Sequence, residues 1–383
     1  MIPLSNKQHN LFVSTKKIQV LKKITMATAT PKFATQKQSF HAELKKRIND
    51  YFSEKSIDQS GNYKLFIKAI ILVLGFTVTY IHLVFFTPSV MFALPEAALL
   101  GGLMSAIGFN VMHDGAHGSF SNSPFINRCA AFTLGVLGGS PFMWNVKHNN
   151  VHHAFTNIDG VDDDLDAKPF LRMASTQKKY KIHNFQHWYF WFFYCLLHFY
   201  WSFVSDYRKY FSKKIGDMPL KKMDTRDHIE FWLFKIIHYS LFLVIPIIKI
   251  GFTSWLLGFI CFTAVAGFVL SIVFQLAHTV EHTHFPMPNE VTGRIEDEWA
   301  IHQLKTTANF ATKNKVVSWL VGGLNFQIEH HLFPKISHVH YPQISKIIKN
   351  ACHEYGIQYV EYPKMRQAVA SHIAYLRHMA RVA

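Results

Sequence analysis

The sequence predicts an all-α integral membrane protein with four transmembrane helices, further helices at the membrane interface, and a cytoplasmic cap that holds a histidine-rich site for two metal ions. Apolar residues make up 49% of the 383 residues and charged residues only 17%, against about a quarter in soluble proteins. The apolar residues form long blocks, and many of the 24 histidines cluster near the ends of those blocks. The composition excludes a disordered chain. Four cysteines without a Cys-x-x-Cys pair exclude a disulfide framework or a cysteine zinc finger.

Four blocks are long enough to cross a bilayer, which needs about 20 helical residues. The predicted spans are residues 65–86, 89–112, 231–249 and 251–277. The last block is the clearest, because it has 27 residues without a charge, or about 40 Å of helix at ~1.5 Å per residue. The alternative, a set of helices buried in a large soluble core, rarely produces four such blocks in one chain.

Two weaker segments are predicted to lie at the interface rather than to span. Residues 126–143 are short and rich in glycine, and residues 187–205 are rich in aromatic side chains, which settle at the membrane–water boundary. Basic residues precede and follow the second segment, from Lys178 to Lys181 and from Arg208 to Arg226. Both of its ends are therefore expected on the same, cytoplasmic side.

The distribution of charge predicts the orientation. Residues 1–63 form a basic cytoplasmic segment with eleven Lys and Arg against four acids, and its first 25 residues are expected to be dispensable, with Met26 as a working start. A membrane domain follows over 64–362, and a cytoplasmic C-terminal helix over 363–383. The net charge of +16 then reflects orientation and attraction to anionic lipids. Nucleic-acid binding is excluded, because the aromatic residues lie inside the apolar blocks.

Histidines occur in four clusters at or between the predicted span ends. The clusters are His113-Asp-Gly-Ala-His117, His148-Asn-Asn-Val-His152-His153, His278-Thr-Val-Glu-His282 and Gln327-Ile-Glu-His330-His331. A spacing of four places two side chains on one helix face, so both imidazoles can bind one metal. A spacing of five, as from His148 to His153, turns further round and suits a neighbouring metal. Eight such histidines on one side of the membrane are too many for one ion and suit two.

The residues alone leave the metal open, because neutral imidazole suits iron, copper, nickel and zinc. The stretch from His278 to His282 also spells the H-x-x-E-H pattern of some zinc peptidases, but its place at the end of a span favours a chance match. The aspartates between Asp159 and Asp166 lack the order of a calcium-binding EF-hand loop. We expect that run to be a solvated loop that supplies hydrogen-bond partners to the histidines.

At these clusters the sequence resembles the membrane fatty acid desaturases, whose pattern is HxxxH, then HxxxHH, then [H/Q]xxHH. The matches are HDGAH at 113–117, HNNVHH at 148–153 and QIEHH at 327–331. A last box that opens with Gln327 is similar to the front-end group, which acts between an existing double bond and the carboxyl end. The stretches HQLKTTANFA (302–311) and GGLNFQIEHHLFPKISHVHYP (322–342) resemble the linoleoyl-CoA type within it.

The resemblance implies a di-iron centre that uses O2 to place a cis double bond in a long, already unsaturated acyl chain, with delta-6 as the expected position. It also implies a ligand set. The implied iron ligands are His113, His117, His148, His152, His153, His278, Gln327, His330 and His331. Gln327 replaces a histidine and can bind directly, through water, or orient a neighbour, and His282 matches no box and is expected behind the ligands.

Partners and location follow from the same resemblance. The substrate is an acyl-CoA or an acyl-lipid. The HPGG haem motif of many front-end enzymes does not occur in the sequence, so electrons are expected from a separate ferredoxin or cytochrome b5, with docking near the basic stretch Arg208–Lys222. The protein is expected to cross a bacterial cell membrane, rather than the endoplasmic reticulum, with both termini cytoplasmic.

Three alternatives stay open. Hydroxylases and ketolases of the same superfamily share the boxes but add oxygen to the substrate. A membrane metal transporter would place ionisable residues near the bilayer midplane, whereas here the mid-span positions are apolar apart from His82 and Glu96. A metal-binding receptor or scaffold would hold metal without changing the fatty acids.

Overall fold

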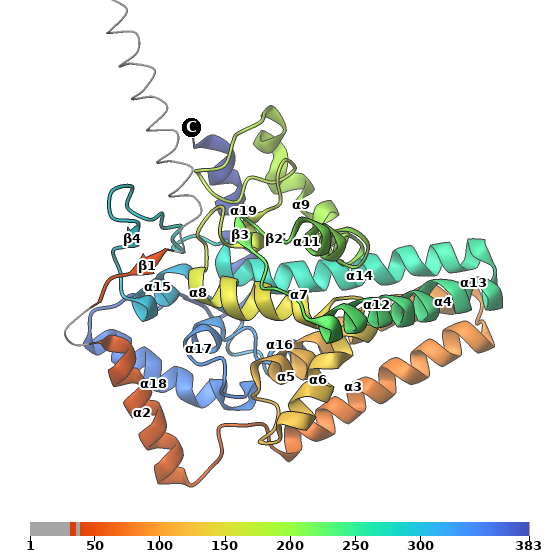
Figure 1. The fold of residues 1–383 in the computed structure, drawn as a ribbon, viewed down its shortest axis with the longest axis horizontal. Coiled ribbons are helices and arrows are strands. Elements are labelled where there is room, and N and C mark those ends of the chain that lie inside the picture. The colour runs from red at the N-terminus through yellow and green to blue at the C-terminus, as the bar shows by residue number, and fades with distance from the viewer. Residues whose placement is uncertain (1–30, 36–38, 383) are drawn as a thin grey trace, which may run out of the picture.

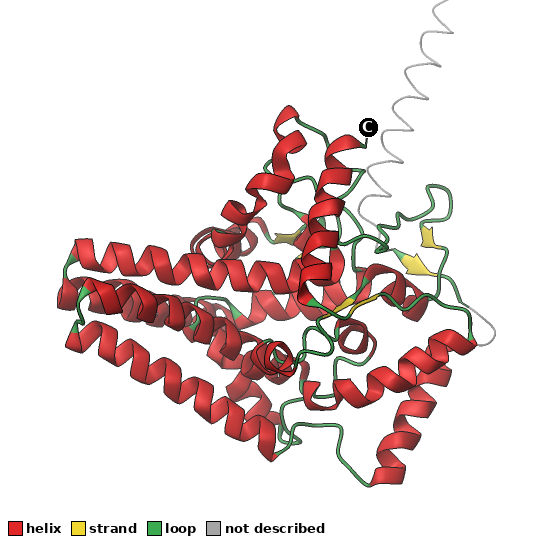
Figure 2. Cartoon of the chain, turned by 180° about the vertical axis from the view of Figure 1, so that it is seen from behind, coloured by secondary structure: helices red, strands yellow, loops and turns green. Residues whose placement is uncertain are grey.

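The computed structural model describes residues 31–35 and 39–382. It is mostly helical, and the described strands are three pairs of two residues each. Four long helices lie side by side and project from a broader region that carries the shorter helices (Figures 1 and 2). The prediction that residues 1–25 are dispensable concerns residues outside the described part of the chain.

The described residues contain four helices long and apolar enough to cross a membrane, which confirms the predicted number of spans. Three of them contain a π-helical turn, which ends the first helix and lies inside the second and third. Their segments are α3 (Tyr63–Ile81) with η1 (His82–Phe86); α4 (Val90–Ile107), η2 (Gly108–Met112) and α5 (His113–His117); α12 (Thr225–Tyr239), η7 (Ser240–Val244) and α13 (Ile245–Ile250); and α14 (Phe252–His278).

Two spans are longer than the apolar blocks predicted. The second runs on to His117, because the polar first histidine box continues the same helix until Gly118 ends it with a left-handed φ of 74°. The third begins at Thr225 rather than at residue 231, because Asp224 and Asp227 form a reciprocal capping box ahead of the apolar residues. A prediction based on apolar residues alone does not include these polar helix ends.

The second and fourth spans pack closely through a glycine. A Cβ added to Gly101 of α4 would lie 2.5 Å from the carbonyl oxygen of Phe262 in α14, so only glycine allows the two backbones to approach. At the adjacent Gly102 an added Cβ would meet nothing within 4 Å. The contact fixes α14 beside the helix that carries the first histidine box.

Short segments connect the second and third spans. They are α6 (Pro124–Val136), α7 (Pro141–Asn145), η3 (Val146–His152), α8 (His153–Phe155), η4 (Asp163–Leu165), η5 (Lys181–Phe185), α9 (Gln186–Cys195), α10 (Leu197–Tyr200), η6 (Trp201–Ser205), α11 (Asp206–Ser212) and the antiparallel pair β2 (Lys214–Ile215) and β3 (Met218–Pro219). The segment predicted over 126–143 is two helices, because the chain turns at Gly138 (φ 105°) and restarts at Pro141. Exposed Trp188, Phe192 and Phe199 leave the aromatic segment with an apolar outer face.

The remaining elements belong to the broader region at one end of the four long helices, which we call the cap (Figures 1 and 2). They are β1 (Lys32–Phe33), α2 (Phe40–Lys55), β4 (Arg294–Ile295), α15 (Trp299–Thr306), β5 (Asn309–Phe310), α16 (Lys315–Leu320), α17 (Gln327–Leu332), η8 (His338–His340), α18 (Tyr341–Glu354), β6 (Glu361–Tyr362) and α19 (Met365–Arg381). Strand β1 pairs in parallel with β4, and β5 with β6. Leu44 and Ile48 of α2 pack with Ile344 and Ile348 of α18 in a core that includes Ile328 of α17, which holds the last histidine box in place.

Candidate metal centre

Eight histidines from all four sequence clusters converge where the second and fourth spans meet the cap. They form three overlapping groups in which the candidate ligand atoms lie within 4.8 Å of one another: His113, His117, His148 and His330; His152, His278 and His331; and His153, His330 and His331. The structure therefore brings together all eight histidines that the sequence singled out. Seven of them are buried, and His117 is nearly so.

The first group joins the end of the second span to the second and third boxes. The Nε2 atom of His148 lies 3.1 Å from Nε2 of His113 and 3.1 Å from Nε2 of His153. The sequence predicted that His153 would turn away from His148 toward a neighbouring metal, and the structure shows the two nitrogens adjacent. The reason is that the chain through His148 and His152 is π-helical, which brings residues five apart onto one face.

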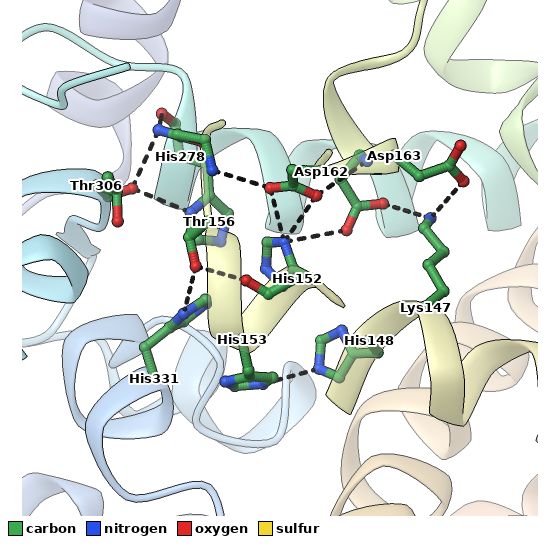
Figure 3. A network of polar contacts seen from close by, with 12 residues as sticks. Lys147, His148, His152, His153, Thr156, Asp162, Asp163, His278, Thr306 and His331 are labelled. Atoms are coloured by element: carbon green, nitrogen blue, oxygen red, sulfur yellow. Dashed lines mark hydrogen bonds and ion pairs between the residues drawn. The ribbon is translucent and has the colours of Figure 1, made fainter. Parts of the chain in front are cut away.

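The second group lies on the far side of His153 and His330. The rings of His152 and His278 are 4.9 Å apart between centroids, as are those of His278 and His331. The ring of His153 is 4.5 Å from both His330 and His331. The two groups thus share a boundary, which suits two metal ions held next to each other. Figure 3 shows the second group, with His148 and His153 beside it.

Hydrogen bonds at the back of the rings orient the histidines. Nδ1 of His331 lies 2.9 Å from Oε1 of Gln303, Nδ1 of His330 lies 3.2 Å from the Tyr341 hydroxyl, and Nδ1 of His278 lies 3.2 Å from the Thr306 carbonyl. Where Nδ1 carries the proton that it donates, Nε2 is left with a free lone pair, the arrangement of metal-bound histidine.

Asp162 orients His152 in the same way. Its Oδ2 lies 3.0 Å from Nδ1 of His152 and also accepts a hydrogen bond from the Asn157 amide at 2.9 Å. Lys147 forms an ion pair with Asp164 behind it. The loop was expected to be solvated and to supply hydrogen-bond partners to the histidines. Asp162 does supply such a partner, but its side chain is buried rather than solvated. Figure 3 shows this chain of contacts from Lys147 to His331.

The chemistry of the cluster fits metal binding. The Nε2 atoms of His117, His278, His330 and His331 are buried and have no hydrogen-bond partner among the described residues, a costly state for a polar atom that a metal would relieve. Burial, reinforced by the neighbouring histidines, favours the neutral form of four imidazoles outside the spans. It lowers the pKa well below the usual value in His148, His153, His330 and His331.

Three other residues from the sequence clusters, Gln327, His282 and Glu281, differ in their position relative to the histidine groups. Gln327 is buried, and its Oε1 has no hydrogen-bond partner among the described residues, so it keeps its place as a candidate ligand. His282 is exposed, has a left-handed φ of 72° and belongs to none of the histidine groups, so the structure places it away from the centre. Glu281 is exposed as well, so the H-x-x-E-H pattern does not build a zinc site.

The sequence prediction missed the residues behind the ligands. Gln303 also accepts a hydrogen bond from the Thr156 hydroxyl at 2.9 Å, and Asp114, inside the first box, lies 2.9 Å from Nδ1 of His338. Gln303 and His338 belong to the stretches whose sequence resembles the desaturase family. That resemblance was the only indication in the sequence that these residues have a role. Their roles required contacts between residues 147 and 224 positions apart.

A cavity of about 960 Å³ reaches the first group of histidines. Its lining combines His117 with the apolar side chains of Leu134 and Trp144 and with charged side chains of both signs, Asp58, Arg128, Lys221, Asp227, Glu230 and Lys335. An elongated molecule with an apolar chain and a polar end suits such a mixture. The cavity therefore offers a substrate access to the histidines from the boundary between spans and cap.

The spans and the buried histidine groups define a membrane protein with a candidate metal centre at the cap end of its helices. Comparison with known sequences gives its class. The fatty acid desaturase family model matches residues 88–363, and the chain belongs to this family. It is a fatty acid desaturase, as the resemblance predicted.

Curated relatives share most of the chain. An sn-1 linoleoyl-lipid 6-desaturase of Synechocystis sp. is 36% identical over 364 residues, which cover 93% of this chain and 99% of the relative. A desaturase of the same name from Arthrospira platensis is 34% identical, with 93% and 96% covered. An acyl-lipid (8-3)-desaturase of Physcomitrium patens is 32% identical, with 91% of this chain and 73% of the relative covered.

Proposed function

We propose that this desaturase is a front-end acyl-lipid enzyme that places a cis double bond at the delta-6 position of lipid-bound linoleoyl chains. The printed names of the two cyanobacterial relatives support the position and the lipid-bound substrate. The observation that carries the proposal is the convergence of eight histidines, seven of them buried, beside a cavity whose lining mixes apolar and charged side chains.

The proposed cofactor is a pair of iron ions. His113, His117, His148 and His330 would hold one ion, and His152, His278 and His331 the other, with His153 between them and Gln327 as a further candidate ligand. Bound iron would supply the oxidising power from O2 that hydrogen removal from unactivated methylene carbons requires. The protein contributes orientation through Asp162, Gln303 and Tyr341.

The cavity next to His117 is the proposed place of the substrate. Its apolar wall at Leu134 and Trp144 would contact methylene groups and exclude water from them. Lys221 and Lys335 would lie near the polar end of the lipid. A front-end enzyme must hold the carboxyl end close to its metals, and this lining places polar groups and a histidine around one space.

The membrane arrangement completes the proposal. The four spans would cross a bacterial cell membrane with the cap and both termini in the cytoplasm. The exposed aromatic face of α9 and α10, with Trp188, Phe192 and Phe199, would lie in the interface, where aromatic side chains are favoured. Conversion of one single bond to an alkene, with O2 reduced to two waters, needs two electrons and two protons from outside the substrate, so a separate electron donor is required.

The test is expression in a host that lacks polyunsaturated fatty acids and is fed linoleic acid, with double-bond positions read by mass spectrometry. We expect a new product two mass units lighter with its added double bond at delta-6, and none from a chain carrying His331→Ala. A product heavier by one oxygen would contradict the proposal in favour of a hydroxylase. Unchanged fatty acids with retained metal would favour a binding protein without turnover.

A further inference from the structure

A basic surface surrounds the β2–β3 hairpin on the cap. Its exposed members are Arg208, Lys213, Lys214, Lys221 and Lys222, and we call it the hairpin surface. Arg208 lies 3.7 Å from carboxylate oxygens of Asp163 and Asp166. The ion pairs found among the described residues involve none of the four lysines, so these four charges are available to a partner.

The hairpin is packed directly on the second histidine box. Ile215 of β2 is fully buried and clusters with Val146 and Val151 of η3. The Asp217 amide donates to the Gly160 carbonyl at 3.0 Å. Gly216 takes a left-handed φ of 55°, and a Cβ there would lie 3.1 Å from the carbonyls of Gly160 and Val161. The hairpin surface is therefore fixed to the segment that carries His148 and His152.

A short chain of polar contacts leads from this surface to a metal-binding histidine. A pocket of about 280 Å³ beneath the hairpin is lined by both kinds of charge: the basic side chains of Lys168, Arg208, Lys209 and Lys214, and the carboxylates of Asp159, Asp162, Asp163, Asp166 and Asp217. Asp162 lies 3.0 Å from Nδ1 of His152, so one carboxylate separates the pocket from a ring of the second histidine group (Figure 3). Electron transfer falls off steeply with distance and is favoured along bonded and hydrogen-bonded paths, so a donor seated here would be well placed.

We infer that the hairpin surface is the docking site of a small soluble electron-transfer protein with an acidic face, and that electrons pass by way of Asp162 and His152. The inference rests on the proposed desaturase function, which requires an external donor. Charge complementarity selects the partner: four unpaired lysines attract a carboxylate-rich face and speed its encounter. The fixed packing of the hairpin keeps that encounter close to the histidines.

Anionic lipid headgroups are the competing occupant, because Lys221 and Lys222 precede the third span by a few residues and basic residues near a membrane attract such lipids. The test therefore uses the full-length, metal-loaded protein in nanodiscs of uncharged phosphatidylcholine. The probe is a plant-type ferredoxin, whose binding is measured by surface plasmon resonance at a series of salt concentrations.

Two charge-reversal variants of the hairpin surface are compared with a matched control. The variants are Lys213→Glu with Lys214→Glu, and Lys214→Glu with Lys222→Glu. Lys221 is left unchanged because it lines the cavity proposed for the substrate. The control is Lys45→Glu with Lys46→Glu, an equal change of charge at exposed positions of α2. We expect each hairpin pair to weaken ferredoxin binding by at least about tenfold at low salt and to flatten its salt dependence, while the control stays near wild type.

The inference is overturned if both hairpin variants bind ferredoxin as the wild type does, or if the control loses as much affinity as they do. A separate single-turnover assay, with dithionite reduction before O2 is admitted, bypasses the donor. Hairpin variants that form wild-type product there have an intact catalytic centre. Absence of product from the wild type in that assay would contradict the proposed function and leave the binding result to be judged alone.

Discussion

The Nδ1 atom of His152 lies 3.0 Å from Oδ2 of Asp162, and both side chains are buried. This contact fixes the ring so that Nε2 faces the histidine groups. Asp162→Asn removes the charge and weakens the preference for that tautomer, so iron affinity should fall by about 10–100-fold. Competitive metal titration measures it. Asp166→Asn, in the same loop and paired with Lys168 and Arg208 instead, should leave iron affinity unchanged; an equal loss there would contradict the orienting role.

Removal of a proposed ligand should abolish both metal binding and activity. His152→Ala and His331→Ala each delete a member of the second histidine group, and we expect bound iron below the wild-type stoichiometry together with no detectable product. Elemental analysis of the purified protein and fatty acid profiles measure the two effects. His282→Ala is the matched control, because that histidine is exposed and belongs to no group. Normal activity of either ligand variant would refute the assignment.

Adjacent glycines of the second span should respond in opposite ways to the same change. Gly101→Ala forces a methyl group into the carbonyl of Phe262, only 2.5 Å away, whereas Gly102→Ala meets nothing within 4 Å. Overpacking typically destabilises by about 1–3 kcal/mol, so Gly101→Ala should lower the Tm in detergent. Gly102→Ala should hold or raise it. Similar Tm values for both variants would show that α4 and α14 are not packed this closely.

A buried ion pair joins the third span to the segment before it. Nζ of Lys235 lies 2.9 Å from Oδ2 of Asp206 and donates to the carbonyls of Gly138 and Ser202. Lys235→Met leaves a buried carboxylate without its counter-ion, which typically destabilises by about 3–5 kcal/mol. Thermal denaturation should show a clear fall in Tm. The control is Lys64→Met, at an exposed lysine of the first span. An equally large fall in Tm for the control would contradict a stabilising role of the buried ion pair.

His372 should make stability depend on pH. Burial lowers its pKa from 6.5 to about 4, and it lies 2.8 Å from the Tyr194 hydroxyl and 2.7 Å from the Thr279 carbonyl. Below pH 6.5 the unfolded chain takes up a proton that the folded chain refuses. Stability from this group therefore falls as pH drops from about 6.5 to 4, by up to about 1.4 kcal/mol per pH unit.

The comparison of His372→Gln with wild type isolates that contribution. We expect the variant to have a lower Tm at pH 7.5, and the difference between the two Tm values to shrink as pH falls toward 4.5. His378→Gln, an equal change at an exposed position of the same helix, should follow the wild-type profile. A gap that stays constant across this range would show that the protonation of His372 is not linked to unfolding.

The spans and the histidine boxes were predictable because each is encoded within one short stretch. Length and apolarity identify a block such as 251–277, and spacing identifies a pair such as His113 and His117. Contacts between distant residues were not predictable in this way. Lys235 interrupted an apolar block in the sequence, and only the fold shows that Asp206 neutralises it. Likewise, the π-helical turn that brings His153 beside His148 leaves no mark in residue spacing.

The histidine cluster draws on positions from His113 near the end of the second span to His331 in the cap. During synthesis, the chain reaches His331 only after all four membrane-spanning helices have been made. The cluster can therefore be completed only after the whole chain from the second span to α17 has been made. A chain that ends before α17 lacks His330 and His331 and cannot complete any of the three histidine groups.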